Sequence, residues 1–168
     1  AQAIQQLLQG VQPGPAADRA RGRIVAQLDA VLKKHPKSVD LRYVRGLARL
    51  ALGKPVAAQQ DLEWVVSKDK DHVPAQLALA GLLLERGQVV DAQERYNRVI
   101  GVNPKSLRAR LGLVLSRLVR GTEYAQAARD LDRIRPTKTT PRLLRGWYRL
   151  AQAWLAYGRG RLKEANAA

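Results

Sequence analysis

A break in the hydrophobic pattern recurs at a constant interval along this chain, and it limits how the chain can fold more than any other feature. Gly53, Gly87 and Gly121 each follow an apolar run, and the two intervals between them are equal, at roughly 34 residues. A glycine at such a place can adopt the left-handed conformation that ends a helix, so that the chain reverses into a second helix. The recurrence therefore predicts tandem helix-turn-helix units rather than one globular domain.

The stretch after each of these glycines repeats one order of small and large apolar residues. An alanine is followed by a large residue four positions later and a branched residue three positions after that, which places all three on one helix face. The sets are Ala58, Leu62 and Val65; Ala92, Tyr96 and Val99; and, with one residue inserted, Ala127, Leu131 and Ile134. Pro36 and Pro104 stop second helices, so the chain restarts after them.

The composition also favours an all-α protein. The 168 residues contain no Phe, Met or Cys, so Leu, Ala and Val must fill the core, and abundant Ala, Leu, Arg and Gln suit helices. No apolar stretch approaches the roughly 20 residues of a membrane span, and residues 1–10 lack the pattern of a signal peptide. The missing initiator Met suggests a processed exported protein or a fragment of a longer chain, and we favour the fragment.

Two segments carry a family resemblance. Residues 147–154 (WYRLAQAW) have large residues at their ends and Ala151 at a place that suits a small residue, and residues 76–83 (QLALAGLL) repeat this order. Together with the constant spacing of the glycines, these segments resemble the tetratricopeptide repeat family. The resemblance covers roughly residues 16–168.

The first full unit departs from the family pattern. Gly46 fits, but Arg42, Arg45 and Arg49 stand at places that are normally large and apolar. Either the aliphatic stems of these arginines cover the core while their charged ends reach water, or the helix is rotated relative to the pattern.

The resemblance implies a right-handed α-solenoid. We expect repeat units at 39–72, 73–106, 107–140 and 141–168, the last one truncated, in one solenoid domain of a longer chain. The N-terminal residues 1–38 form a degenerate repeat or a cap, with a short helix near 2–9 and a longer one near 16–34. The expected helix pairs are 39–52 with 55–68, 73–86 with 89–102, 107–120 with 122–135, and 141–157 with a short 161–168.

The residues give little support to catalysis. His35 and His72 both fall in predicted connectors, where a solvated or helix-capping imidazole is the usual explanation. Without cysteine or a pair of histidines at ligand spacing, no metal site is predicted, and the glycines are spaced as helix stops rather than as a phosphate loop. We therefore predict a protein that is not an enzyme and has no cofactor.

The resemblance implies that the first helices of successive units line a concave groove. The inward places are occupied by Tyr43, Leu47, Leu50, Leu77, Leu84, Leu111, Leu115, Leu118, Tyr148, Gln152 and Leu155. Such a groove suits self-association, or a protein or peptide segment, for instance a helical one, that is partly apolar or acidic. Its inward places lack the Lys, Arg and Asn of the family's clamp for carboxyl-terminal peptides. The alternative is that these leucines only pack against neighbouring helices.

The positive charge lies mainly in the C-terminal part of the chain. The formal net charge is +16, and residues 101–168 account for +11 of it. A basic rim beside the groove is predicted from Arg108, Arg117, Arg120, Arg142, Arg145 and Arg149. Such a rim favours an acidic protein, an anionic polymer or an anionic membrane surface, whereas the alternative is a solvated surface without a partner.

The leading hypothesis from the sequence is a non-catalytic scaffold that holds a protein segment in the groove. The resemblance adds bacterial cell-envelope assemblies, including secretion, pilus and exopolysaccharide-export systems, so we favour the periplasm or cell envelope over the cytoplasm. The alternative hypothesis is that the basic surface binds an acidic polysaccharide, nucleic acid or anionic lipid. Nucleic acid is the weakest of these ligands because most aromatic residues have a role in the repeat core.

Overall fold

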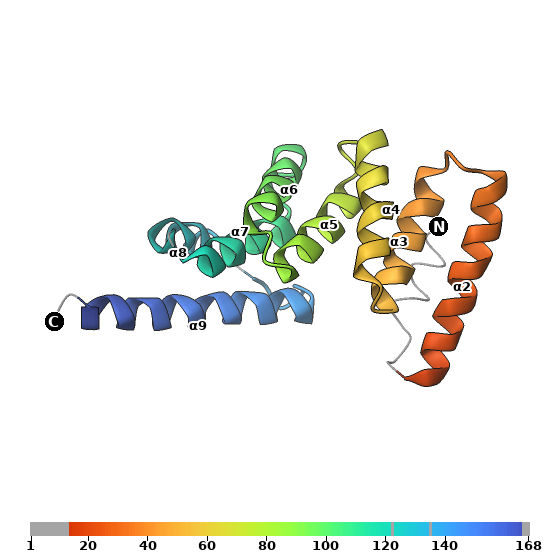
Figure 1. Cartoon of the computed structure of the whole chain (residues 1–168). Coiled ribbons are helices and arrows are strands. Elements are labelled where there is room, and N and C mark those ends of the chain that lie inside the picture. Colours follow the sequence, from red (N-terminus) through yellow and green to blue (C-terminus); the bar gives the residue numbers. More distant parts are fainter. Residues whose placement is uncertain (1–13, 122, 135, 166–168) are drawn as a thin grey trace. The chain divides into compact units, whose positions relative to one another are not determined.

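Helices are the only regular elements in the part of the chain that the structure describes. This structure is a computed structural model that describes residues 14–121, 123–134 and 136–165. The helices are α2 (Pro15–Lys34), α3 (Val39–Ala51), α4 (Pro55–Lys68), α5 (Val73–Glu85), α6 (Val89–Val102), α7 (Leu107–Arg120), α8 (Tyr124–Asp132) and α9 (Arg142–Ala165) (Figure 1). The predicted all-α class is confirmed, whereas the short helix expected near 2–9 lies outside the described residues.

The three recurring glycines form the same turn. Gly53, Gly87 and Gly121 have φ angles of 66°, 75° and 76°, all in the left-handed region, and no other kind of residue has a positive φ in the described ranges. The amide of each glycine donates to the carbonyl oxygen three residues earlier at 3.0 to 3.1 Å. The glycine turns predicted from the equal spacing are therefore confirmed.

Two compact units make up the chain, residues 1–82 and residues 83–168, and the boundary falls within α5. In the first unit, α3 packs between α2 and α4, the two helices it contacts most (Figure 1). Leu28, Val44, Ala48 and Leu62 are buried there. These residues lie on the faces of α2, α3 and α4 that pack against one another.

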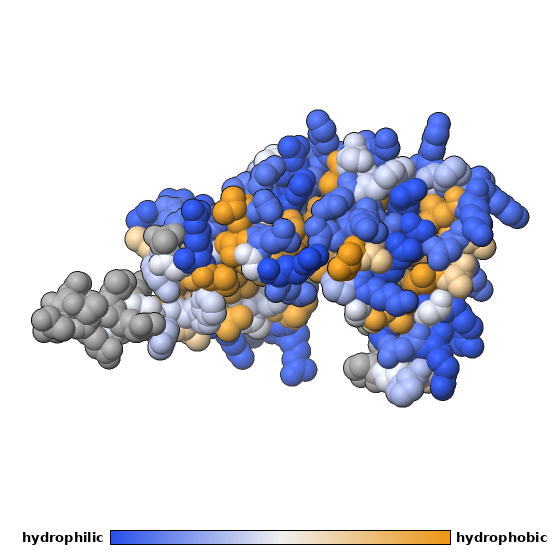
Figure 2. All heavy atoms as spheres, viewed as in Figure 1, coloured by the Kyte–Doolittle hydropathy of each residue, from blue (hydrophilic) through white to orange (hydrophobic). Residues whose placement is uncertain are grey.

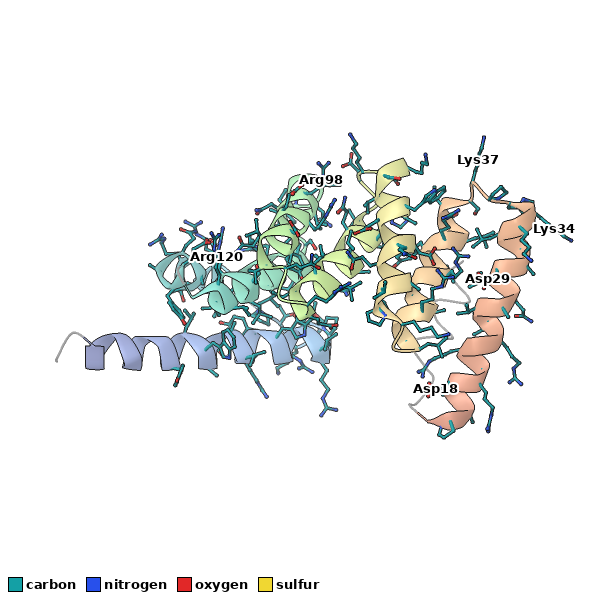
Figure 3. The ribbon with its side chains drawn as sticks, in the orientation of Figure 1. Asp18, Asp29, Lys34, Lys37, Arg98 and Arg120 are labelled. Carbon is teal, nitrogen blue, oxygen red and sulfur yellow. The ribbon has the colours of Figure 1, made fainter. Side chains whose placement is uncertain are left out.

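A partly buried cluster of ion pairs, centred on the buried Asp61, ties the three helices of the first unit together. Arg45 of α3 donates to Asp29 of α2 at 2.6 Å and through its Nε to Asp61 of α4 at 2.9 Å. Arg49 also donates to Asp61 at 2.7 Å, and the Asp61 side chain is only 3% exposed. Asp29 lies on α2 beside α3 (Figure 3). The hydrogen bond that Arg45 donates to Asp61 is the main reason that the pKa of Arg45 is raised above its usual value.

The unusual arginines of α3 are thus explained by partners. Arg45 and Arg49 find carboxylates on the neighbouring helices, and the guanidinium of Arg42 lies 4.1 Å from the centre of the Trp64 ring. A cation over an aromatic face is attracted by the ring, so the Arg42 guanidinium lies over Trp64 rather than extending freely into water. Neither alternative proposed from the sequence anticipated these partners.

In the second unit, α7 is the central helix and contacts α6, α8 and α9. Its core contains Leu111, Val114, Leu115, Leu118, Ala127, Leu131, Ile134, Ala151 and Leu155. Gly112 of α7 lies directly against the ring of Tyr96, where an added Cβ would overlap the ring. This fit leaves Tyr96 1% exposed, and burial raises the pKa of its phenol to about 12.

The C-terminal helix differs from the sequence-based expectation. A turn was expected between helices at 141–157 and 161–168, but α9 runs unbroken from Arg142 to Ala165. Gly158 lies within α9, and the Tyr124 ring approaches it so closely that its Cε1 would lie 2.8 Å from an added Cβ. The second helix expected at 122–135 is also shorter, with α8 ending at Asp132.

Neutralising Asp61 should destabilise the first unit. In Asp61→Asn, the partly buried Arg45 and Arg49 lose the buried carboxylate that they share, and breaking a buried pair costs about 3–5 kcal/mol. Urea denaturation should show this loss, and hydrogen exchange should place it in α2, α3 and α4. The exposed Asp132→Asn is the matched control and should change stability by less than about 0.5 kcal/mol. Equal stability of both variants would show that the ion pairs contribute nothing.

Two glycine-to-alanine substitutions should change the free energy of unfolding in opposite directions. Gly112→Ala should lower the free energy of unfolding by about 1–3 kcal/mol, because the new methyl group overlaps Tyr96. Gly101→Ala, in α6 with open space around it, should raise the free energy of unfolding by up to about 1 kcal/mol through helix propensity. Thermal denaturation of both variants measures the difference. A stabilised Gly112→Ala protein would refute the close packing on Tyr96.

Candidate partner-binding site

Six of the residues assigned to the groove are buried. They are Tyr43, Leu77, Leu111, Leu115, Leu118 and Leu155. In the second unit Leu111, Leu115, Leu118 and Leu155 belong to the hydrophobic core itself. These side chains hold helices together and offer little surface to a partner, as the packing alternative expected.

The other assigned residues remain accessible to different degrees. Leu47 and Leu50 of α3 are half-buried in the first unit, and Gln152 of α9 is exposed. Leu84 and Tyr148 are half-buried and pack against the core of the second unit. The accessible part of the predicted groove is therefore smaller than the sequence indicated, and it includes the polar face of α9.

A pocket on α9 joins predicted groove residues to predicted rim residues. It has a volume of about 330 Å³ and is lined by Pro136, Arg145, Tyr148, Arg149 and Gln152. Pro136 comes from the connection before α9, whereas the other four residues come from two successive turns of the helix. The pocket thus offers one aromatic ring, one amide and two guanidinium groups to a ligand.

The predicted basic rim separates into two kinds of arginine. Arg117 pairs with Glu123 and Asp130, and Arg120 also reaches Glu123 at 3.3 Å (Figure 3). These two charges are largely compensated within the second unit. In contrast, Arg108, Arg142, Arg145 and Arg149 are exposed and have no acidic partner within the described ranges. Of the six rim arginines, these four can direct uncompensated charge to a ligand.

Figure 2 shows that hydrophilic residues cover most of the visible face, with smaller hydrophobic patches between them. A second pocket of about 240 Å³ lies among α6, α7 and α8, where Arg110, Arg117 and Arg133 share its wall with Asp130. Arg110 donates to the backbone carbonyl of Arg133 at 3.0 Å. This pocket was not predicted, because its residues come from three helices and follow no spacing in the sequence.

The two histidines lie at helix ends, His72 before α5 and His35 after α2. His72 accepts a hydrogen bond from the Ala75 amide at 3.1 Å, which caps the start of α5, and its ring lies 4.9 Å from the Tyr43 ring. His35 is exposed at the end of α2. Within the described residues, no group of His, Cys, Asp and Glu could hold a metal ion, and no helix is long and apolar enough to cross a membrane.

Comparison with known proteins identifies the family. Two models of the tetratricopeptide repeat match residues 16–72 and 49–114, so that together they extend over more than half of the chain. The chain belongs to the tetratricopeptide repeat family. Arrays of this repeat generally act as scaffolds that bind protein or peptide partners, and the family fold is generally non-catalytic.

Relatives of this tetratricopeptide repeat protein match it only in part. DnaJ homolog subfamily C member 3 from Rattus norvegicus and from Homo sapiens are 31% identical over 80 residues, which is 48% of this chain and 16% of those proteins. The crystal structure of a tetratricopeptide repeat protein from Parabacteroides merdae aligns with a TM-score of 0.68 at 20% identity. That alignment covers 99% of this chain and 68% of the other, and it shows the same all-α solenoid fold.

Introducing a glutamate at either of two adjacent positions of α7 should distinguish a core position from a surface position by its effect on stability. Leu118 is 1% exposed, so Leu118→Glu buries a carboxylate in the core and should unfold the second unit. Val119 is 45% exposed, and Val119→Glu should change stability by less than about 0.5 kcal/mol. Circular dichroism during thermal unfolding measures both. If the Leu118→Glu protein were stable, Leu118 would be a surface residue of the groove and not part of the core.

Proposed function

We propose that this protein is a non-catalytic scaffold that holds a protein segment bearing acidic side chains, with the pocket on α9 as one contact point. The observation that carries this proposal is the meeting of Tyr148 and Gln152 with Arg145 and Arg149 around one cavity. The general role of the repeat family supports the scaffold, whereas the pocket supports the chemistry of the partner.

The pocket has the donors that a carboxylate requires. Arg145 and Arg149 are four residues apart, so they lie on the same side of α9 about one turn apart. Each guanidinium can donate two parallel hydrogen bonds to a carboxylate, and the ring of Tyr148 can cover an apolar part of the segment. An extended or helical segment with two acidic residues near an apolar one would satisfy all three groups.

The overall charge supports the same class of partner. A protein with a net charge of +16 attracts an acidic partner over long range and repels a basic one. We also propose a bacterial cell-envelope assembly as the setting, on the family resemblance alone. In that setting the scaffold would hold two components together rather than transform either.

A second candidate function is binding of an anionic polymer, such as an acidic polysaccharide. The four uncompensated arginines Arg108, Arg142, Arg145 and Arg149 favour it, because a polymer needs several cations but no shaped pocket. Salt separates the two functions. Binding of a polyanion weakens steeply as the salt concentration rises, whereas contacts with an apolar side chain persist.

Replacing the pocket arginines should weaken binding of a segment selected for this protein. We would select peptides from a random library on the intact chain, and then measure their affinities by fluorescence polarisation, with heparin as the polyanion probe. Arg145→Gln combined with Arg149→Gln should weaken the selected peptides by about tenfold or more, because each charge-assisted contact contributes about 1 kcal/mol. Lys34→Gln combined with Lys37→Gln, at exposed sites on and after α2 (Figure 3), is the matched control and should have no effect.

The outcomes distinguish the two candidate functions. Peptides that still bind at high salt and lose affinity only in the pocket variant support the scaffold. If no peptide is selected and heparin binds with a steep salt dependence, the polymer function replaces it. If the pocket variant binds the selected peptides as well as the control does, the pocket has no part in recognition.

A further inference from the structure

The pocket among α6, α7 and α8 is lined by residues that recur at helical spacing in three segments of the second unit. Intervals of three and four residues separate the members of each set, so each helix contributes one face. The sets are Asn97, Ile100 and Pro104 from α6 and the turn after it, Arg110, Leu113 and Arg117 from α7, and Gln126, Asp130 and Arg133 from α8 and its end. We call this cavity of about 240 Å³ the three-helix pocket.

Two guanidinium groups of the three-helix pocket have no acidic partner within the described part of the chain. Arg117 pairs with Asp130 and Glu123, so its charge is compensated. No carboxylate of the described ranges lies within ion-pair distance of Arg110 or Arg133. Arg110 instead donates to the backbone carbonyl oxygen of Arg133 at 3.0 Å, which holds its guanidinium at the end of α8. Two uncompensated positive charges therefore border one cavity.

The first unit has the same repeat positions, which allows a comparison within one chain. α2 ends at residue 34 and α6 at residue 102, and α3 begins at residue 39 and α7 at residue 107, so equivalent residues of these helices are 68 positions apart. α4 begins at residue 55 and α8 at residue 124, a separation of 69 positions. The residues equivalent to Asn97, Arg110, Arg117, Asp130 and Arg133 are Asp29, Arg42, Arg49, Asp61 and Trp64.

Contacts within the first unit satisfy both arginines at these positions. Arg49 donates to Asp61 at 2.7 Å and lies 3.7 Å from a carboxylate oxygen of Asp29. The guanidinium of Arg42 lies 4.1 Å from the centre of the Trp64 ring. Each cation at these positions thus has a carboxylate or an aromatic face of the chain itself as its partner.

The second unit keeps one of these contacts and lacks the groups for the others. The ion pair remains, between Arg117 and Asp130. An amide, Asn97, stands at the position of the second carboxylate, and Arg133 stands at the position of the aromatic ring. Arg110 and Arg133 both line the cavity, and their like charges repel each other unless an anion lies between them. Positions that the first unit fills with its own side chains therefore form an open, positive cavity in the second.

We propose that the three-helix pocket binds a phosphate monoester, with the phosphate between Arg110 and Arg133. A phosphate monoester carries a charge of about −1.5 to −2 at pH 7, which matches two uncompensated guanidinium groups better than a single carboxylate does. A guanidinium also donates two parallel hydrogen bonds to phosphate oxygens. The amide of Asn97 adds a neutral donor at the same wall.

The organic part of the ligand is small and apolar. Leu113 is buried and Ile100 is half-buried, and together with Pro104 they form the apolar part of the pocket wall. The cavity is smaller than the roughly 300–1,000 Å³ of clefts that enclose drug-sized ligands, so it accepts a group about the size of one aromatic ring. A free phosphomonoester and a phosphorylated side chain of a protein both present this chemistry. The site shares no residue with the pocket on α9, so it does not rest on the proposed function.

Titration of the intact chain with phenyl phosphate, in a buffer without phosphate, tests the site. Two-dimensional amide NMR spectra give the dissociation constant and should show the largest shifts at the end of α6, the start of α7 and the end of α8. Benzoate has the ring but only one carboxylate, and inorganic phosphate has no apolar part. Both should bind about tenfold more weakly than phenyl phosphate, or weaker still.

The pH dependence distinguishes a phosphate dianion from a carboxylate. Affinity for phenyl phosphate should fall about fourfold between about pH 7.5 and about pH 5.5, because the phosphate gains a proton with a pKa near 6. The charged groups that line the pocket are three arginines and the ion-paired Asp130, and both histidines of the chain lie in the first unit. Affinity for benzoate is the control for titration of the protein itself and should stay constant over this range.

Two variants copy the first unit into the second. Arg133→Trp supplies the ring over which Arg110 can lie, and Asn97→Asp supplies the missing carboxylate. Each should weaken binding of phenyl phosphate about tenfold or more without lowering thermal stability. Arg110→Gln should weaken it by a similar factor, and the repeat accepts this residue because Gln76 stands at the equivalent position of α5.

The matched control removes the same amount of charge from the same unit. Lys105→Gln combined with Lys138→Gln, at exposed lysines that do not line the pocket, should leave the affinity for phenyl phosphate unchanged. An equal loss in this control and in the pocket variants would show that only the overall charge attracts the anion, and would overturn the inference. If Arg133→Trp melts early, Arg110→Gln decides in its place.

Further results would also overturn the inference. One is benzoate binding as tight as that of phenyl phosphate, and another is unchanged affinity in Arg110→Gln. Inorganic phosphate that binds as tightly as phenyl phosphate would reduce the pocket to a nonspecific anion site. Peptides with one phosphotyrosine then identify the source. Binding about tenfold tighter than that of phenyl phosphate supports a phosphorylated protein, whereas equal or weaker binding supports a free phosphomonoester.

Discussion

The described helices bury their apolar faces against one another, and glycine turns bring α4 back onto α3 and α8 back onto α7. The left-handed conformations of Gly53, Gly87 and Gly121 make that return possible, because a side chain at these φ angles would be strained. The consequence is clearest in α7, whose residues from Leu111 to Ser116 are all buried. These six residues of α7 support the neighbouring helices, whereas Arg108 and Val119 of the same helix stay exposed.

In the first unit, ion pairs as well as apolar contacts hold the helices against one another. Arg45 and Arg49 occupy places where the family usually has large apolar residues, and they are tolerated because Asp29 and Asp61 pair with them. Buried ion pairs add little net stability compared with apolar packing, but they strongly disfavour any arrangement that separates the partners. The ion pairs therefore specify which faces of α2, α3 and α4 meet.

In the second unit, the residues best placed to contact a partner lie on α9. Among the six arginines of the predicted rim, Arg117 and Arg120 are compensated by acidic residues of their own unit, whereas Arg108, Arg142, Arg145 and Arg149 are exposed without such a partner in the described ranges. Three of these four arginines lie on α9, which also carries the pocket lined by Tyr148 and Gln152. The three-helix pocket, with Arg110 and Arg133, is a separate positive site that shares no residue with the pocket on α9.

The amino-acid sequence by itself determined the all-α class, the constant repeat interval, the three glycine turns and the positions of most helices, because these follow from local spacing and backbone preference. It did not determine that α9 continues through Gly158, because only the approach of Tyr124 shows why that glycine is needed. Periodicity placed Leu111, Leu118 and Leu84 on one side of their helices but could not predict whether these side chains are buried or exposed. The tertiary structure decided their burial, since exposure and charge pairing depend on which neighbouring helix covers each side chain.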